Sequence, residues 1–253
     1  MLRADGFDGL LLVAQPGNVP RVPKGINTNF RVDTAINQAQ AAAYPNTLPK
    51  DRPAYPNPHL TPDPTDAVLV SYFTVLLNNP AISGLAPMID WSQLNPNNPG
   101  SDPAHPRSGA YTWNALDDVF AAVDQWNRSH RFLPPKTIQI ILSSGFNSPN
   151  WVFNDIDASV CGAVAGSCGS CDGLFMSTPP VPALSPECGY TTLFWRTEGG
   201  PSIQIPLPMP WNSVYKSDFG TFLTALNQHL QQEPSSSAFV SITISGLQRP
   251  PPK

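Results

Sequence analysis

Apolar residues recur along this chain in two alternating patterns, one typical of helices and the other typical of buried strands. Apolar positions three or four residues apart predict three helices, over residues 66–78, over 113–127 and following Ser217. Thr65 and Ser217 are the predicted N-caps of the first and the third of these helices. Short, nearly continuous apolar runs predict four strands, over residues 9–14, 82–91, 136–145 and 239–245. Strands that alternate with helices usually pair in parallel through right-handed crossovers. We therefore expect an α/β fold with about four parallel strands and covering helices.

Two segments interrupt this rhythm. Residues 1–65 form a region rich in Pro and Asn, and the prolines between residues 16 and 65 predict no regular element there. Residues 146–213 are rich in Gly and contain all four cysteines, so we interpret them as an insertion. A hairpin is predicted within it, over residues 190–195 and 202–205.

The remaining chain length decides between a whole barrel and part of one. A complete (β/α)8 barrel typically takes about 250 residues. This chain has 253 residues, but the two irregular segments leave room for only about four strands. We therefore expect residues 66–253 to form a partial (β/α) barrel that carries the Cys/Gly-rich insertion.

Charge and hydropathy exclude two classes of protein. Lys+Arg 14 against Asp+Glu 18 gives a formal net charge of -4, and only 13% of residues are charged. Binding to nucleic acid through phosphate neutralisation is therefore not expected. No run of about 20 apolar residues is present, so no membrane span is expected. Asp5 and Asp8 interrupt the first apolar segment, and we find no secretory signal in it.

The four cysteines are clustered, at positions Cys161, Cys168, Cys171 and Cys188. Two disulfides are the favoured interpretation, and they would imply an extracellular or periplasmic location despite the absence of a signal peptide. Zinc is the alternative, although one CxxC pair with two single cysteines matches only part of a zinc pattern. Because GxGxxG and P-loop motifs are missing, we expect no cofactor.

Candidate binding residues follow the predicted strands. Ligands of parallel α/β proteins bind at the carboxyl ends of the strands. Aromatic, amide and acidic side chains gather after those ends, at Asp90, Trp91, Asn147, Trp151 and Trp211. Indole rings beside hydrogen-bonding groups suit a sugar, which has an apolar ring face and a hydroxyl rim. The alternative is that the three tryptophans only pack the loops onto the sheet.

Several short motifs resemble a known family. They are Gly84, Trp91-Ser92, Tyr111-x-Trp113-x-x-Leu116-Asp117, Gly145 and Pro149-x-Trp151. Together they resemble the N-terminal half of retaining TIM-barrel glycoside hydrolases, the beta-galactosidase-like and cellulase-like group, over roughly residues 66–246. The resemblance implies a secreted protein that binds an oligosaccharide or polysaccharide.

The family's catalytic residues have no counterparts here. In that family the fourth strand is followed by an Asn-Glu pair whose Glu is the general acid/base, and the nucleophile Glu lies on the seventh strand. In this chain no Glu follows Gly246, and no seventh strand is present. We therefore expect a chain truncated after the fourth strand that binds carbohydrate without hydrolysing it. The alternatives are a non-enzymatic carbohydrate-binding or interaction module, and a complete hydrolase that uses other acids such as Asp90.

Overall fold

The computed structural model of the chain describes residues 26–56, 63–100, 106–107, 109–161, 189–196 and 202–245. The predicted strand at 9–14 lies outside these residues, as do Cys168, Cys171 and Cys188. The pairing of the cysteines and their insertion therefore stay predictions. Within the described residues, no helix is long and apolar enough to cross a membrane.

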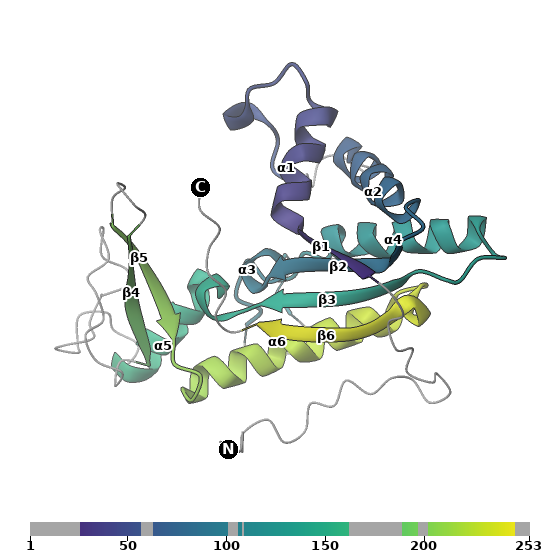
Figure 1. Cartoon of the computed structure of the whole chain (residues 1–253). Helices are drawn as coiled ribbons and strands as arrows, with labels where there is room; N and C mark the ends of the chain where they lie inside the picture. Colours follow the sequence, from purple (N-terminus) through teal and green to yellow (C-terminus); the bar gives the residue numbers. More distant parts are fainter. Residues whose placement is uncertain are drawn as a thin grey trace.

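Four parallel strands form the main sheet (Figure 1). They are β1 (Ile26–Arg31), β2 (Ile82–Asp90), β3 (Thr137–Ser143) and β6 (Phe239–Ser245). Their order in the sheet, β1-β2-β3-β6, is their order along the chain, and every neighbouring pair is parallel. Successive right-handed crossovers in one direction place the connecting helices on one face of such a sheet. The prediction of an α/β fold with four parallel strands and covering helices is confirmed.

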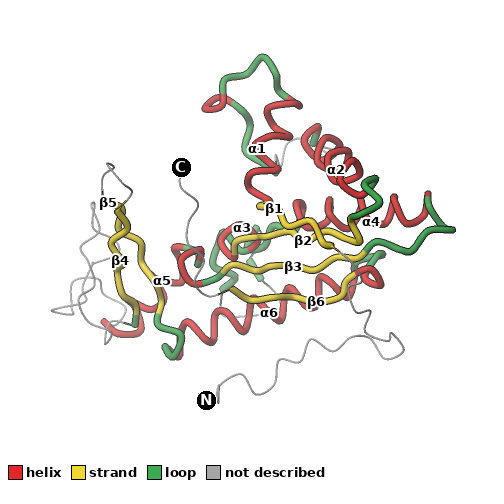
Figure 2. The backbone as a smooth tube through the Cα atoms, viewed as in Figure 1, coloured by secondary structure: helices red, strands yellow, loops and turns green. Residues whose placement is uncertain are grey.

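Helices and a hairpin complete the fold (Figure 2). The helices are α1 (Val32–Ala43), α2 (Pro64–Leu77), α3 (Trp91–Leu94), α4 (Asn114–Ser129), α5 (Asn150–Cys161) and α6 (Ser213–Gln232). Short 3-10 turns are η1 (Pro49–Asp51), η2 (Gly145–Asn147) and η4 (Ser236–Ala238). The predicted hairpin is confirmed as the antiparallel pair β4 (Tyr190–Arg196) and β5 (Ser202–Pro208).

The expectation of no regular element between residues 16 and 65 was wrong. Strand β1 and helix α1 lie there, and β1 pairs with β2 at the edge of the sheet. The reason is local, because no proline occurs between Pro23 and Pro45 and the segment before Pro45 is rich in alanine and glutamine. Proline density averaged over fifty residues hid a proline-free interval long enough for a strand and a helix.

Two predicted helix caps were also wrong by a few residues. Asp63 caps α2 instead of Thr65, since its carboxylate accepts the Thr65 backbone N–H at 2.8 Å. Asn212 caps α6 instead of Ser217, since its side-chain oxygen accepts the Tyr215 N–H at 3.0 Å. Asp and Asn are among the strongest N-cap residues. Each helix therefore begins directly after one of them, earlier than its apolar spacing indicates.

The hydrophobic core lies between the sheet and its helices. Ile138, Ile140 and Leu142 alternate along β3 and are fully buried on the face that meets the helices. Helix α5, which the prediction placed inside an irregular insertion, adds Val152 and Phe153 to the same core. Burial of a large apolar side chain contributes roughly 1.5–3 kcal/mol. The start of the predicted insertion is therefore part of the folded core.

The opposite face of the sheet carries polar side chains near the start of its strands and includes a position that only glycine can occupy. Asn27 Nδ2 donates to Gln139 Oε1 at 3.3 Å, across the intervening strand β2. Gly84 of β2 lies against this pair, and a Cβ built on it would come within 2.9 Å of Asn27 Oδ1 and 2.6 Å of Thr137 Oγ1. It would also collide with the Thr137 carbonyl oxygen, which belongs to the sheet backbone. Absence of a side chain at residue 84 therefore allows β1 and β3 to be joined over β2.

We expect Gly84→Ala to lower the free energy of unfolding by about 1–3 kcal/mol, because the added methyl group must displace strand backbone. Gly220→Ala is the matched control, since a Cβ at this position of α6 meets nothing within 4 Å. Alanine there should raise the free energy of unfolding by about 0.5–1 kcal/mol through helix propensity. Urea denaturation followed by circular dichroism measures both. Equal effects of the two substitutions would contradict this account of Gly84.

Candidate functional site

A cluster of four polar side chains occupies the carboxyl edge of the sheet. It consists of Arg31 at the end of β1, Asp90 at the end of β2, Ser143 at the end of β3 and Asn147 in η2. Arg31 Nη2 donates to Asp90 Oδ2 at 3.0 Å. Asn147 Nδ2 donates to Asp90 Oδ1 at 3.0 Å and lies 2.7 Å from Ser143 Oγ. We refer to these residues as the strand-end cluster.

Local backbone geometry brings the cluster together. Gly145 has a φ of 69°, a left-handed conformation that favours glycine, and it turns the chain after β3 so that Asn147 reaches back to Asp90. Gln93 Oε1 accepts the Asp90 backbone N–H at 3.0 Å and fixes the end of β2. The structure thus brings Asp90 and Asn147, two of the candidate binding residues, into direct contact.

Arg31 interacts with two carboxylates and stabilises one of them more than the other. Arg31 also bonds Asp33, with Nε and Nη2 each 3.0 Å from a carboxylate oxygen. Burial raises the pKa of Asp33, but Arg31 outweighs burial and holds that pKa below its ordinary value. Burial also raises the pKa of Asp90, and here Arg31 reverses only part of the shift. With one guanidinium between two carboxylates, the group carries a net charge of about -1 when both acids are ionised.

Trp91 does not take part in a surface site. Its side chain is fully buried, and its indole N–H donates to Asn95 Oδ1 at 3.2 Å. Phe219 and Phe222 pack on it with ring centroids 5.0 and 5.6 Å away. A ring enclosed in this way has no face left for a sugar, so of the two interpretations of Trp91 the structure favours packing.

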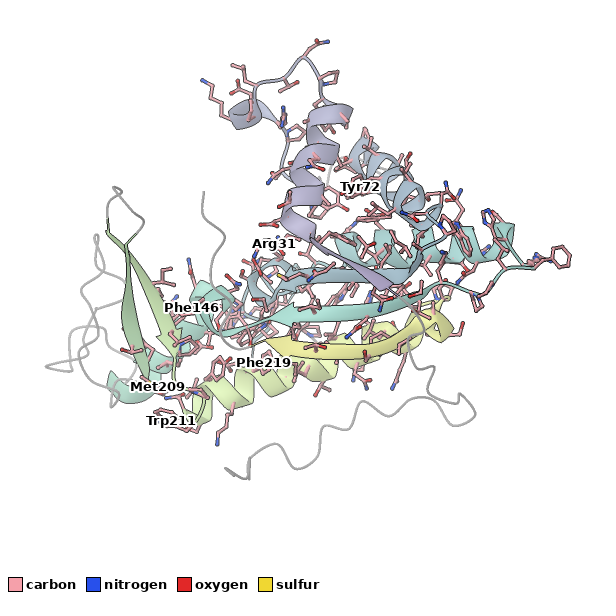
Figure 3. All side chains as sticks on the ribbon, in the orientation of Figure 1. Arg31, Tyr72, Phe146, Met209, Trp211 and Phe219 are labelled. Carbon is pink, nitrogen blue, oxygen red and sulfur yellow. The ribbon has the colours of Figure 1, made fainter. Side chains whose placement is uncertain are left out.

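Trp151 packs in the core against Trp91, and Trp211 lies apart from the strand-end cluster. Trp151 belongs to the first turn of α5, where it packs edge-to-face on Trp91 at 6.0 Å and donates its indole N–H to the Asn95 carbonyl at 3.0 Å. Trp211 is 68% exposed. Figure 3 places it beside the start of α6, away from Arg31 and Phe146 at the strand ends. The three tryptophans therefore do not form one binding platform.

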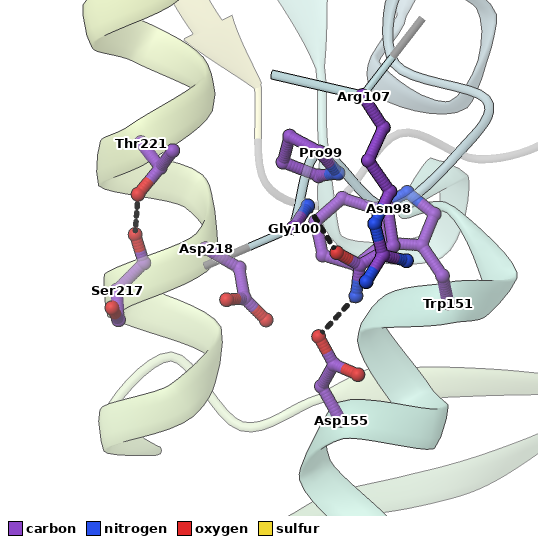
Figure 4. Close-up of a pocket in the computed structure, with 9 residues that line it drawn as sticks. All are labelled: Asn98, Pro99, Gly100, Arg107, Trp151, Asp155, Ser217, Asp218 and Thr221. Atoms are coloured by element: carbon purple, nitrogen blue, oxygen red, sulfur yellow. Dashed lines mark hydrogen bonds between the residues drawn. The ribbon is translucent and has the colours of Figure 1, made fainter. Parts of the chain in front are cut away.

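A cavity of about 400 Å³ lies between α5, α6 and the loop that follows α3 (Figure 4). Residues that line it include Asn98, Arg107, Trp151, Asp155, Asp218 and Thr221. Asn98 Nδ2 donates to Asp155 Oδ2 at 2.7 Å, and Asn98 Oδ1 accepts the Gly100 N–H at 2.7 Å. We refer to this space as the α5–α6 cavity; its volume is within the range of small-molecule sites.

Both acids of the α5–α6 cavity have a raised pKa. Burial, assisted by the charge of Asp155, raises the pKa of Asp218 to about 7. Burial also raises the pKa of Asp155, while Asn98 and Arg107 oppose that shift. Asp218 Oδ2 is buried and has no hydrogen-bond partner within the described parts of the chain. Asp218 thus contributes to the cavity wall a carboxylate with one oxygen that no donor of the described residues satisfies.

A third cluster of side chains contains residue types that can bind a metal ion. Donor atoms of Asp117, His229 and Glu233 all lie within 4.8 Å of one another. His229 Nε2 lies 2.7 Å from Asp117 Oδ1 and 3.5 Å from Glu233 Oε1, and its ring stacks on Trp113 at 4.7 Å. These contacts join the beginning of α4 to the end of α6, and they account for the cluster without a ligand.

Sequence reasoning missed several residues of these sites. Arg31 fell in the segment expected to be irregular, so its alignment with Asp90 depends on a strand that was not predicted. Asp218 did carry a signal, because it occupies the same helical stripe as Tyr215 and Phe222, which are buried. A carboxylate on an apolar stripe indicates a group held at an internal surface.

These features define an α/β protein whose parallel sheet follows chain order and carries a polar cluster at its carboxyl edge. No known protein family, curated protein or solved structure matches the chain. The resemblance to glycoside hydrolases therefore stays a prediction.

Proposed function

We propose that the chain binds carbohydrate at the carboxyl edge of its sheet and does not hydrolyse it alone. The observation that carries this proposal is the strand-end cluster, in which Asp90 is bonded by both Arg31 and Asn147. The carboxyl edge is where ligands of parallel α/β proteins bind. We also propose that the four strands in chain order are part of a (β/α) barrel, since barrel strands follow that order.

The chemistry of the strand-end cluster favours a hydroxylated, uncharged ligand. A net charge of about -1 for Arg31 with its two carboxylates disfavours phosphates and other anions. Each sugar hydroxyl both donates and accepts, so it can bond a carboxylate oxygen and an amide N–H of the same cluster. Arg31 and Asp90 keep 25% and 12% of their side chains exposed, and Phe146 beside Asn147 is half-buried. A ligand can therefore reach polar atoms next to an aromatic ring.

Hydrolysis requires a pair of carboxyl groups with separate roles, of which one must hold a proton. The low pKa of Asp33 keeps it ionised at neutral pH, and Asp90 is bonded on both oxygens. Neither is arranged as a general acid. We therefore expect binding without turnover, and we keep an extracellular or periplasmic location with two disulfides as part of this proposal.

Calorimetric titration with cellohexaose, xylohexaose and mannohexaose tests the proposal. We expect at least one of these sugars to bind, and we expect Asn147→Ala and Asp90→Asn each to weaken that binding about tenfold, the loss of about 1.4 kcal/mol. Asp51→Asn, an exposed acid in η1 remote from the sheet, is the matched control and should bind as the unmodified chain does. No binding by the unmodified chain, or equal binding by all four proteins, would overturn the proposal.

A further inference from the structure

The α5–α6 cavity differs chemically from the strand-end cluster and plays no part in the function proposed above. In the strand-end cluster the carboxylate oxygens of Asp90 are satisfied by neighbouring side chains. In the cavity, Asp218 Oδ2 is buried without a hydrogen-bond donor among the described residues. A carboxylate oxygen left without a donor destabilises the fold, so a ligand whose donor reaches that carboxylate recovers free energy.

The charges around this unused oxygen favour a cation. Asp155 of α5 faces Asp218 of α6 across the cavity (Figure 4), and the two charges repel. Arg107 is the cation of the lining; it is exposed and acts on Asp155. With both acids ionised the lining therefore carries a net charge of about -1, and a positive ligand would relieve the repulsion.

The size and the donor set of the cavity distinguish an organic cation from a metal ion. Calcium takes six to eight oxygen ligands, whereas the cavity offers two carboxylates and the side-chain oxygen of Asn98 already accepts the Gly100 N–H. A volume of about 400 Å³ is also far larger than one ion needs. Trp151 lines the same space, and because its N–H is bonded to Asn95 it offers apolar ring atoms.

We infer that the α5–α6 cavity binds a small, ring-sized molecule that carries a protonated primary amine. The ammonium group donates to the carboxylate of Asp218 and to that of Asp155, which Asn98 holds in place. An ammonium has three donors and no acceptor, which matches two carboxylates. The carbon skeleton of the ligand lies against Trp151.

Binding should depend on pH through Asp218. Its pKa of about 7 means that it is mostly protonated at pH 5.5 and mostly ionised at pH 8. Asp155 of α5 and Arg107 of the loop are the charged groups that face it across the cavity. The affinity for an amine should therefore rise on the order of tenfold from pH 5.5 to pH 8.

Calorimetric titration with cyclohexylamine, beside cyclohexanol as its uncharged counterpart, tests this site. We expect the amine to bind at pH 8, the alcohol to bind at least about tenfold more weakly, and the amine to weaken on the order of tenfold at pH 5.5. Both Asp218→Asn and Asp155→Asn should weaken amine binding about tenfold, while Asp51→Asn should leave it unchanged.

Three outcomes would overturn the inference. They are no binding of cyclohexylamine at pH 8, equal binding of the amine and the alcohol, and amine binding that both cavity substitutions leave unchanged. The use of two separate acids guards against one variant that fails to fold. Because the probes contain no sugar, failure here leaves the carbohydrate proposal standing, and failure of the carbohydrate proposal leaves this one standing.

Discussion

Between pH 5 and pH 8 the free energy of unfolding will fall, and the substitution Asp118→Asn will remove much of that fall. Asp118 of α4 is 9% exposed. Burial, together with the charges of Asp66, Asp117 and Asp63, raises its pKa from 3.8 to about 7, although the hydroxyl of Tyr55 donates to it at 2.8 Å and lowers the shift. The folded chain thus holds a proton that the unfolded chain releases near pH 4.

The sign of the effect follows from these two pKa values. A carboxyl group whose pKa is raised by folding stabilises the fold fully below the unfolded pKa, and this contribution is lost as the pH rises through the folded pKa. For Asp118 the loss between pH 5 and pH 8 is about 2 kcal/mol. Asp218, whose pKa is also about 7, adds a fall of the same sign.

Asparagine at position 118 keeps an oxygen that accepts the Tyr55 hydroxyl and carries no charge. We therefore expect Asp118→Asn to be more stable than the unmodified chain at both pH values, with an advantage that is about 2 kcal/mol larger at pH 8 than at pH 5. Urea denaturation at both pH values measures this, with Asp51→Asn as the exposed control. If the free energy of unfolding of Asp118→Asn falls between pH 5 and pH 8 as much as that of the unmodified chain, Asp118 is ionised in the fold at neutral pH and this account is wrong.

Trp91→Ala will cause the largest loss of stability among single substitutions of the tryptophans. Trp91 is fully buried and contacts four aromatic rings, with centroids 5.0–6.0 Å away. Truncation of a buried aromatic side chain costs about 3–5 kcal/mol, through lost burial and the cavity that remains. The change also leaves Asn95 Oδ1 without the indole N–H that it accepts.

Trp211→Ala is the matched control, because that side chain is 68% exposed. Its effect should stay within about 0.5 kcal/mol. Far-UV circular dichroism in urea measures both variants without depending on tryptophan fluorescence. Comparable losses for the two substitutions would contradict the placement of Trp91 in the core and Trp211 on the surface.

The fold could largely be predicted because apolar runs identify buried strands. The apolar segments at Ile82–Asp90, Thr137–Ser143 and Phe239–Ser245 became β2, β3 and β6. Helix α5 was missed because glycine and cysteine downstream dominated the composition, although Trp151, Val152, Phe153 and Ile156 give it a buried face. The composition of a long segment is a poor guide to a single helix within it.

The candidate site was harder to predict because its contacts join residues far apart in sequence. Asp90 and Asn147 could be placed together, since both follow predicted parallel strands whose carboxyl ends share one edge. Arg31 bonds Asp90 only through the register of β1 against β2, which pairs Arg31 with Met88. Spacing along the chain contains no information on that register.

Nuclear magnetic resonance of the ¹⁵N-labelled chain, titrated with the hexasaccharide that binds it best, tests the proposed carbohydrate site most directly. The account predicts that the largest amide shifts fall at the strand ends, in residues 31–33, 90–93 and 143–147, and that Asn147→Ala requires about tenfold more sugar to produce them. Shifts confined to residues outside these segments, with the strand ends unaffected, would contradict it.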